Sequence, residues 1–278
     1  MTRTLIGLSG GLDSTYTLYK TLTETNDEVT ALIISFNRTS YNKSILMDVE
    51  SKEEYEGKIR NIKKIVGWLK ANVRDFTLVE HEYDPDLLIR SQIDTPGVGP
   101  VVYIVMHAVE KINRNELDKI VLSNEKENDG FNYSRHGHTP GAKRALDFFK
   151  SKAKRGSITF PLIEMNYHQG NAISELPKEL YAMTRSCSDA DYDSEPCGIC
   201  FKCSKRKFFA EMIDQGKSME EIADYVYQKS MKPNGKWRSM KVWLFDEVST
   251  YKRFNKNHTR PLLDYEVNPP VYPESYIA

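Results

Sequence analysis

The first stretch whose residue types suggest chemistry is Ser9-Gly10-Gly11-Leu12-Asp13-Ser14, close to the start of the chain. Adjacent glycines can take positive φ and allow a ligand to approach the bare backbone. The amides that follow would be the unpaired donors of a helix start, which attract anions. Ser9 and Ser14 add hydroxyl donors, and Asp13 suits a role in shaping the loop or holding Mg²⁺. These residues predict a phosphate-binding loop.

The spacing of this loop differs from the common phosphate-binding motifs. A Walker A loop, G-x-x-x-x-G-K-S/T, needs a lysine after its last glycine, and none follows here. The loop also lacks the G-x-G-x-x-G pattern of dinucleotide-binding folds. The alternative is a glycine turn whose role is only geometric, as in many strand–helix connections.

The second stretch contains all four cysteines of the chain, Cys187, Cys197, Cys200 and Cys203. Two overlapping C-x-x-C steps and one upstream thiolate form a natural tetrahedral set, so we expect a structural Zn²⁺ site with no open position. A disulfide framework is disfavoured in a reducing compartment, and a thioredoxin-type pair would use only two cysteines. An iron–sulfur cluster, which also uses four cysteines, stays as the alternative.

The elements that must position these residues alternate between strand and helix in the first half of the chain. Apolar runs typical of strands cover 3–8, 29–36, 76–79 and 119–124, and helical spacing covers 13–25, 55–69 and 101–112. The continuous apolar run at 29–36 suits a strand buried on both faces, as in a parallel sheet. The fold class predicted is therefore α/β, a doubly wound parallel sheet, followed by a small C-terminal zinc-binding helical region.

Ligands of such sheets bind outside the carboxyl ends of the strands, at the point where the strand order reverses. The glycine loop follows the first strand, Ser35 and Phe36 end the second, and Asn124 follows the fourth. We expect these residues to share one edge, with an adenine slot near residues 34–36. Ordinary polarity at strand ends is the alternative explanation for Ser35, Phe36 and Asn124.

The composition excludes several classes of protein. The 278 residues contain 39 basic and 39 acidic side chains, a balance that does not indicate a nucleic-acid coat protein or a polybasic membrane binder. No apolar run approaches the roughly 18 residues of a membrane span. A strand at residues 3–8 leaves no room for a signal peptide, so we expect a cytoplasmic protein with reduced cysteines.

The glycine loop resembles the PP-loop, S-G-G-x-D-S, of the N-type ATP pyrophosphatases, which cleave ATP between the α and β phosphates. Together with the late C-x(n)-C-G-x-C-x-x-C pattern, it resembles the 7-cyano-7-deazaguanine synthase family. Thr184-Arg185-Ser186-Cys187 is close to the T-W-S-C of that family, and Phe160-Pro161-Leu162 agrees with its lead-in. Asn171-Ala172-Ile173 resembles the K-x-E-I helix start without its Lys and Glu. The resemblance covers about residues 3–30 and 119–210.

This resemblance implies an adenine nucleotide alpha hydrolase-like fold and an ATP-dependent C–N ligase that acts as a homodimer in queuosine biosynthesis. Its substrate would be 7-carboxy-7-deazaguanine, converted with ammonia and two ATP through the amide to the nitrile. The implied cofactors are ATP, Mg²⁺ and Zn²⁺. The implied ATP-binding residues are Leu8, Ser9, Gly10, Gly11, Leu12, Asp13, Ser14, Thr15, Ser35 and Phe36, with Ser9, Asp13 and Ser14 as the catalytic set.

The expected substrate loop departs from the family pattern D-x-S-x-Y-x-D. Asp129 and Tyr133 fit it, whereas Phe131 replaces the serine and Arg135 the second aspartate. We expect Asn124, Asp129, Tyr133 and Arg135 to bind the substrate. The added positive charge suggests a nucleotide or a nucleic-acid-linked deazaguanine. A solvated loop is the alternative, and a metal site at the following H-x-H is a weaker one.

We divide the chain into an ATP-binding α/β domain over 1–180, a four-cysteine zinc-binding helical region over 181–230, and a C-terminal extension over 231–278. The extension mixes basic and aromatic side chains, which suit covering the core or a dimer partner, or binding a single nucleic-acid strand. Three further functions stay open: an enzyme that stops at the amide or conjugates an acyl group to nucleic acid or protein, a PP-loop tRNA-modifying enzyme, and a non-enzymatic zinc and nucleotide module.

Overall fold

The computed structural model describes residues 1–36, 52–83, 100–124, 140–165, 169–187, 195–198, 200–230 and 244. Its strands are β1 (Arg3–Gly7), β2 (Glu28–Phe36), β3 (Thr77–Tyr83), β4 (Lys119–Val121) and β5 (Ser157–Thr159). Its helices are α1 (Leu12–Glu24), α2 (Lys52–Asn72), α4 (Pro100–Asn113), α5 (Pro140–Lys152), α6 (Pro161–Glu164), α7 (Gln169–Glu175), α8 (Lys178–Met183), α9 (Phe201–Asp214) and α10 (Met219–Ser230). None of the helices described is both long and apolar enough to span a membrane.

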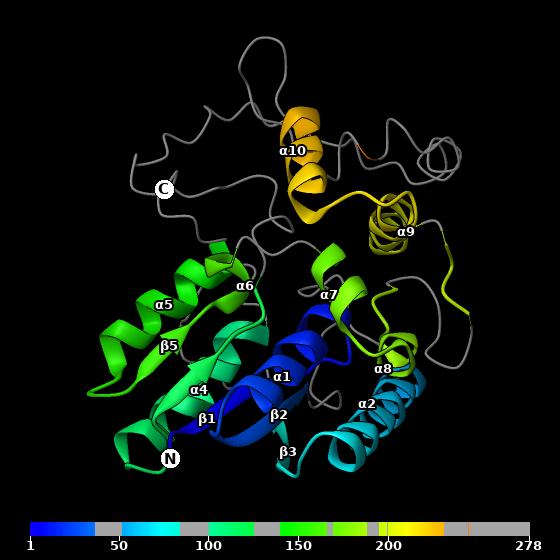
Figure 1. The fold of residues 1–278 in the computed structure, drawn as a ribbon. Helices are drawn as coiled ribbons and strands as arrows, with labels where there is room; N and C mark the ends of the chain where they lie inside the picture. The colour runs from blue at the N-terminus through cyan, green and yellow to red at the C-terminus, as the bar shows by residue number, and fades with distance from the viewer. Residues whose placement is uncertain are drawn as a thin grey trace.

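The five described strands form one sheet in the order β3-β2-β1-β4-β5, and every pair is parallel (Figure 1). β1 lies in the middle, with Gly7 opposite Leu32 of β2 and Ile6 opposite Val121 of β4. The predicted doubly wound parallel α/β sheet is therefore confirmed. The order reverses between β1 and β4, which is where such sheets bind ligands.

Helices cover both faces of the sheet because successive strand residues point to opposite sides. Ile6, Ala31 and Ile33 pack with buried residues of α1 and α2 on one face. Leu5, Leu32 and Ile34 pack with α4 and α5 on the other. This two-sided burial explains the continuous apolar run of β2, which would alternate in a sheet with one face in water.

The N-terminal ends of β1 and β4 are joined by a charged hydrogen-bond network. The Asp118 carboxylate accepts hydrogen bonds from the Arg3 backbone nitrogen at 3.0 Å and from its guanidinium at 2.8 and 2.9 Å. Arg155 also donates to Asp118, at 2.9 Å. The hydrogen bonds from Arg3 hold the pKa of Asp118 well below its usual range. These contacts fix β4 against β1 at the edge opposite the glycine loop.

A smaller helical region follows the sheet, and Figure 1 shows α9 and α10 together at one end of the molecule. Phe209, Ile222 and Val226 form its buried core. A capping box begins α10. There Ser218 N donates to Glu221 Oε2 at 2.8 Å, and Glu221 N donates to Ser218 Oγ at 3.2 Å.

Candidate functional site

The glycine loop connects β1 to α1 beside the position where the strand order reverses (Figure 1). Gly10 has φ +76°, and a Cβ there would lie 2.9 Å from Ile62 Cγ1. Both facts require glycine at this position: other residues are strained in left-handed backbone, and a Cβ would clash with Ile62. Gly11 is the N-cap of α1 and supplies no side-chain cap. Side chains of the loop itself therefore do not cap this helix start.

The two loop serines bond within the loop. Ser14 Oγ accepts a hydrogen bond from Ser9 N at 3.2 Å and lies 3.0 Å from Ser9 Oγ. Ser9 Oγ also accepts from Gly11 N at 3.4 Å, and Ser14 Oγ lies 3.2 Å from the Gly11 carbonyl. Ser14 is buried, whereas Ser9 is exposed. The buried hydroxyl of Ser14 therefore holds the loop in shape through contacts with Ser9 and Gly11, whereas Ser9 is accessible to a ligand.

Asp13 lies in the first turn of α1, where its negative charge is favoured by the helix dipole. Its Oδ1 accepts a hydrogen bond from Gln169 Nε2 at 3.4 Å. Gln169 begins α7 and is only 4% exposed, and its Oε1 has no partner within the described chain. Sequence reasoning missed Gln169, because 156 positions separate it from Asp13.

The segment before the first cysteine lies against the glycine loop. Arg185 N donates to the Gly10 carbonyl at 2.9 Å, and Ser186 Oγ accepts from Leu12 N at 3.3 Å. Sequence reasoning compared 184–187 with a family motif but gave Ser186 no role. The motif itself was the signal, because a residue directly before a cysteine of the four-cysteine cluster is held close to that cluster.

The other predicted site residues fall at the same edge or outside the described part of the chain. Ser35 and Phe36 end β2, although only their backbone is described. Asn124 follows β4 by three residues and, by the register of Ile6 with Val121, reaches the level of Ser9. Asp129, Tyr133 and Arg135 lie outside the described residues.

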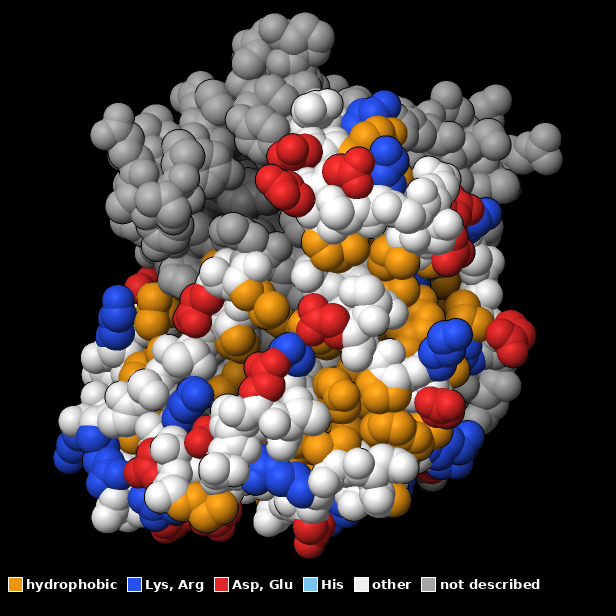
Figure 2. Space-filling view, viewed as in Figure 1, with side chains coloured by type: hydrophobic (Ala, Val, Ile, Leu, Met, Phe, Trp, Pro, Cys, Tyr) orange, Lys and Arg blue, Asp and Glu red, His pale blue; other side chains and the backbone are white. Residues whose placement is uncertain are grey.

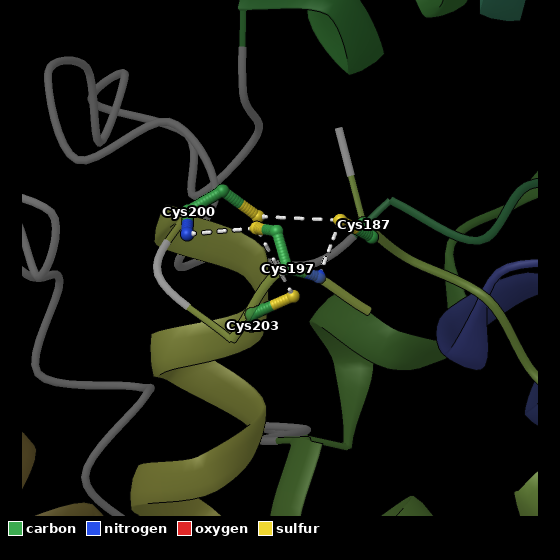
Figure 3. Close-up of side chains that lie close together, drawn as sticks. All are labelled: Cys187, Cys197, Cys200 and Cys203. Carbon is green, nitrogen blue, oxygen red and sulfur yellow. Dashed lines mark hydrogen bonds between the residues drawn. The ribbon is translucent and has the colours of Figure 1, made fainter. Parts of the chain in front are cut away.

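The four cysteines converge on one point, and Figure 3 shows their sulfur atoms directed toward one another. All four Sγ atoms lie within 4.8 Å of one another, and the Cys197–Cys203 and Cys187–Cys200 pairs are each 4.0 Å apart. Sulfur atoms at ~2.3 Å from a tetrahedral zinc ion would stand about 3.8 Å apart. The spacing thus fits four ligands of one metal ion.

Local structure supports thiolates at this centre. Cys200 is the N-cap of α9 and Cys203 lies in its first turn, where the helix dipole favours negative sulfur. Cys200 N donates to Cys197 Sγ at 3.3 Å, and Cys197 N donates to Cys187 Sγ at 3.4 Å. Without a metal, burial raises the pKa of the Cys203 thiol above its ordinary value. A bound cation would stabilise four thiolates together here.

The surface around these sites carries both signs of charge. Figure 2 shows basic and acidic side chains interspersed over one face of the described molecule, without a broad stripe of either sign. A nucleic-acid backbone binds best to a continuous positive track. The described part of this face therefore offers no extended track for a nucleic acid.

Comparison with known proteins places the chain in a family. The family model described as "Queuosine biosynthesis protein QueC" matches residues 3–212, which include the glycine loop and all four cysteines. No curated protein matches the chain. The solved U34-tRNA thiolase NcsA from Methanococcus maripaludis, with its 4Fe–4S cluster, aligns over 99% of this chain and 79% of its own. That alignment has 13% identity and a TM-score of 0.38, too low to bear on substrate or metal.

The family match covers most of the chain and joins the two features that the fold brings together, the loop after β1 and the four-cysteine centre. Members of this family are built on the PP-loop ATP pyrophosphatase fold, which uses ATP to adenylate a substrate. The chain belongs to the QueC family and is an ATP-using enzyme of the adenylating kind.

Proposed function

We propose that this chain is a 7-cyano-7-deazaguanine synthase, an ATP-dependent C–N ligase that converts 7-carboxy-7-deazaguanine and ammonia through the amide to the nitrile. The observation that carries the proposal is the match to the QueC model over a glycine loop at the switch point of a parallel sheet. The proposed ATP-binding residues are Leu8 to Thr15 with Ser35 and Phe36, and the proposed catalytic residues are Ser9, Asp13 and Ser14.

In the first step a carboxylate oxygen of the substrate attacks the α-phosphorus of ATP. The bond from that phosphorus to the β-bridging oxygen breaks, which gives an acyl adenylate and pyrophosphate. Negative charge grows on the departing phosphates, and the amides of the loop and the α1 dipole oppose that charge. The main contribution of the protein to this step is to position the carboxylate against the α-phosphorus, because the acyl adenylate forms without an acid or base from the protein.

Ammonia then adds to the acyl carbon and loses a proton, and AMP leaves with its bonding electron pair, so that the product is the primary amide. In the second round the amide oxygen attacks another ATP at its α-phosphorus and releases pyrophosphate. Loss of both protons from nitrogen and departure of AMP, which carries the former amide oxygen away from carbon, then leave the nitrile. Two ATP are consumed, and each yields AMP and pyrophosphate.

Two metals belong to this proposal. We assign Zn²⁺ to Cys187, Cys197, Cys200 and Cys203, since the sulfur spacing fits one ion and four ligands leave no open position. We assign Mg²⁺ to Asp13, an oxygen ligand of the kind that this ion prefers, at the start of α1. Bound with ATP, Mg²⁺ would neutralise charge on the leaving pyrophosphate.

The substrate side of the proposal comes from the sequence. Asn124, Asp129, Tyr133 and Arg135 are the proposed substrate-binding residues. We also propose the division into an ATP-binding domain (1–180), a zinc-binding helical region (181–230) and an extension (231–278), and a homodimeric enzyme. The basic Arg135 favours one second candidate, an adenylating enzyme whose deazaguanine is part of a nucleotide or nucleic acid.

Mass spectrometry of the products tests the proposal directly. The protein is incubated with ATP, Mg²⁺, ammonia and 7-carboxy-7-deazaguanine, either as the free base or as its nucleotide. The expected result is the nitrile from the free base, with two AMP formed per nitrile. Turnover of the nucleotide alone would replace the proposed reaction by the second candidate, and an amide as the final product would show an enzyme that stops before the second adenylation. Absence of AMP with every acceptor would refute both.

A further inference from the structure

Residues 181–187 form a short bridge between the four-cysteine centre and the glycine loop. The bridge ends at Cys187, a member of the four-cysteine cluster. Just before that cysteine it touches the loop twice, through Arg185 N on the Gly10 carbonyl and Ser186 Oγ on Leu12 N. A Cβ at Gly11 would lie 3.5 Å from the Arg185 carbonyl and 3.6 Å from Ser186 Oγ. The bridge therefore packs directly on the bare backbone of the loop.

The hydroxyl of Ser186 accepts a hydrogen bond from the Leu12 amide, which is one of the amides that a helix start would offer to a phosphate. This bond leaves the hydroxyl hydrogen of Ser186 to be donated elsewhere. Among the described residues, the hydrogen-bond partner of the Ser186 hydroxyl is the Leu12 amide. A hydroxyl that accepts a hydrogen bond becomes a better donor, because linked hydrogen bonds polarise one another. The Leu12 amide thus strengthens a donor that lies beside Gly11.

The bridge is held from behind by α9. Arg206 donates to the carbonyl oxygens of Thr184 at 2.8 Å and Tyr181 at 2.9 Å, and to the Tyr181 hydroxyl at 2.8 Å. Its guanidinium also stacks 4.0 Å from the Tyr181 ring centroid. On the other side, Asn61 of α2 donates to the Met183 carbonyl at 2.9 Å. With Cys187 fixed by the metal, both ends of the bridge are anchored.

We infer that Ser186 is an ATP-binding residue that donates its hydroxyl hydrogen to a phosphate oxygen, and that the four-cysteine centre sets its position. The inference rests on the proposed function, because it assumes that the loop binds the ATP phosphates. It gives the metal a second task besides stability, since the ion fixes the residue directly after Ser186. ATP affinity should then depend on the metal, although the metal contacts no part of the nucleotide.

ATP binding to the full chain, measured by calorimetry with Mg²⁺ and no acceptor substrate, tests this inference without any turnover. Ser186→Ala should raise the Kd for ATP about tenfold, the size of one hydrogen bond to a charged group. Ser186→Thr, which keeps the hydroxyl, should stay within about threefold of the parent. The matched control is Ser174→Ala, an exposed α7 serine that bonds only the Asn171 carbonyl at 3.0 Å. Its Kd should not change.

The metal arm compares the parent and Ser186→Ala before and after chelation. Removal of the metal should weaken ATP binding by the parent about tenfold and leave Ser186→Ala nearly unchanged, because the two losses share one contact. Arg206→Lys provides a second route if the metal-free chain unfolds. It keeps the charge but loses the forked donors, so it should raise the Kd while the metal stays bound.

Each outcome decides the inference. An unchanged Kd in Ser186→Ala overturns the donor role, and equal losses on chelation in both proteins overturn the coupling. So does an Arg206→Lys protein that binds ATP like the parent. If the parent itself binds no ATP, the proposed function fails together with the inference. Parent binding with no difference among the variants removes the inference alone.

Discussion

At the residue scale, Asp13 lies in the first turn of α1, where backbone amides favour anions, so its carboxylate would repel a phosphate bound at the same helix start. The hydrogen bond from Gln169 at 3.4 Å orients one carboxylate oxygen. A carboxylate oxygen is also a ligand of the kind that Mg²⁺ prefers, as the proposed function requires. Under the proposed function, Asp13 would act through Mg²⁺ and Gln169 would act by orienting Asp13.

We predict that Asp13→Asn lowers kcat for pyrophosphate release about a hundredfold, because the amide loses the charge that holds the cation. The measurement is pyrophosphate release under saturating ATP. Asp75→Asn is the control, since Asp75 is an exposed carboxylate whose side chain pairs with Lys70 at 2.7 Å. Pyrophosphate release at the parent rate by a folded Asp13→Asn protein would show that this carboxylate takes no part.

Gly10 and Gly67 make a matched pair of glycines for a stability test. Gly10→Ala places a Cβ in left-handed backbone and 2.9 Å from Ile62 Cγ1, so it should cost about 2 kcal/mol in the free energy of unfolding. Gly67 lies within α2, and a Cβ there meets nothing within 4 Å. Gly67→Ala should stabilise by about 0.5–1 kcal/mol. Urea unfolding of both proteins measures the difference, and equal effects would contradict the loop geometry.

At the element scale, the four-cysteine centre joins the start of α9 to the segment that contacts α1. Without metal, the thiols lose the ion that holds them together, and the start of α9 and residues 184–187 should loosen. At a thousandfold excess over Kd a bound ion contributes about 4 kcal/mol, or roughly 10 °C in Tm for a chain of this size. We predict a Tm lower by this amount after chelation, restored by Zn²⁺.

Hydrogen exchange locates the effect of metal removal. The amides of Cys197 and Cys200, which donate to Cys187 Sγ and Cys197 Sγ, should exchange faster in the chelated protein. Amides in β1 and β2 should exchange at their original rates. A chelated protein with an unchanged Tm and unchanged exchange at these cysteines would mean that no metal holds the cluster.

Helices and strands long enough to show a periodic or continuous apolar pattern could be predicted from the sequence, whereas short helices held by contacts with distant segments could not. The period of 3.6 residues in α2 and the apolar run of β2 result from burial against the sheet, so the sequence alone displays them. α6 has four residues and α8 has six, too short for a periodic pattern. α5 had a usable signal that was missed, Pro140 at its first position and the buried pair Ala145 and Phe149.

The candidate site divides in the same way. The glycine loop and the cysteines could be found because their chemistry depends on residues close together in the sequence. Gln169 and Ser186 reach the loop across 156 and 174 positions, and no local pattern records such a contact. Their place is determined by how the chain returns to the carboxyl edge of the sheet after β5.

At the scale of the whole molecule, the helix layer on the second face contains a half-buried histidine. The ring of His107 in α4 lies against that of His81 in β3, with centroids 4.6 Å apart and planes tilted by 55°, and His107 Nε2 has no partner within the described chain. Burial, with the charges of His81 and Lys111, lowers the pKa of His107 to about 4, against a smaller opposite effect of Glu110. The folded protein therefore keeps this ring neutral.

This makes stability fall as the solution is acidified. In the unfolded chain His107 becomes protonated near pH 6.5, whereas in the folded protein it stays neutral down to about pH 4. The contribution of neutral His107 to the free energy of unfolding is therefore fully present above pH 6.5 and is lost as the pH falls from 6.5 to about 4. For a ring open to solvent on one side, about 1 kcal/mol should disappear between pH 7 and pH 5. We predict that His107→Asn reduces this loss, as measured by urea unfolding at both pH values. An equal pH dependence in the variant would contradict it.

The central place of β1 has a consequence for the newborn chain. Its partner on one side, β2, follows within 30 residues, but β4 is separated from it by more than 100, as the Arg3–Asp118 contact across 115 positions shows. At the pace of the ribosome, one edge of β1 stays unpaired for roughly ten seconds after it is made. A bare strand edge invites association with other chains. Production of this protein should therefore profit from chaperones that bind the chain early, before β4 has been made.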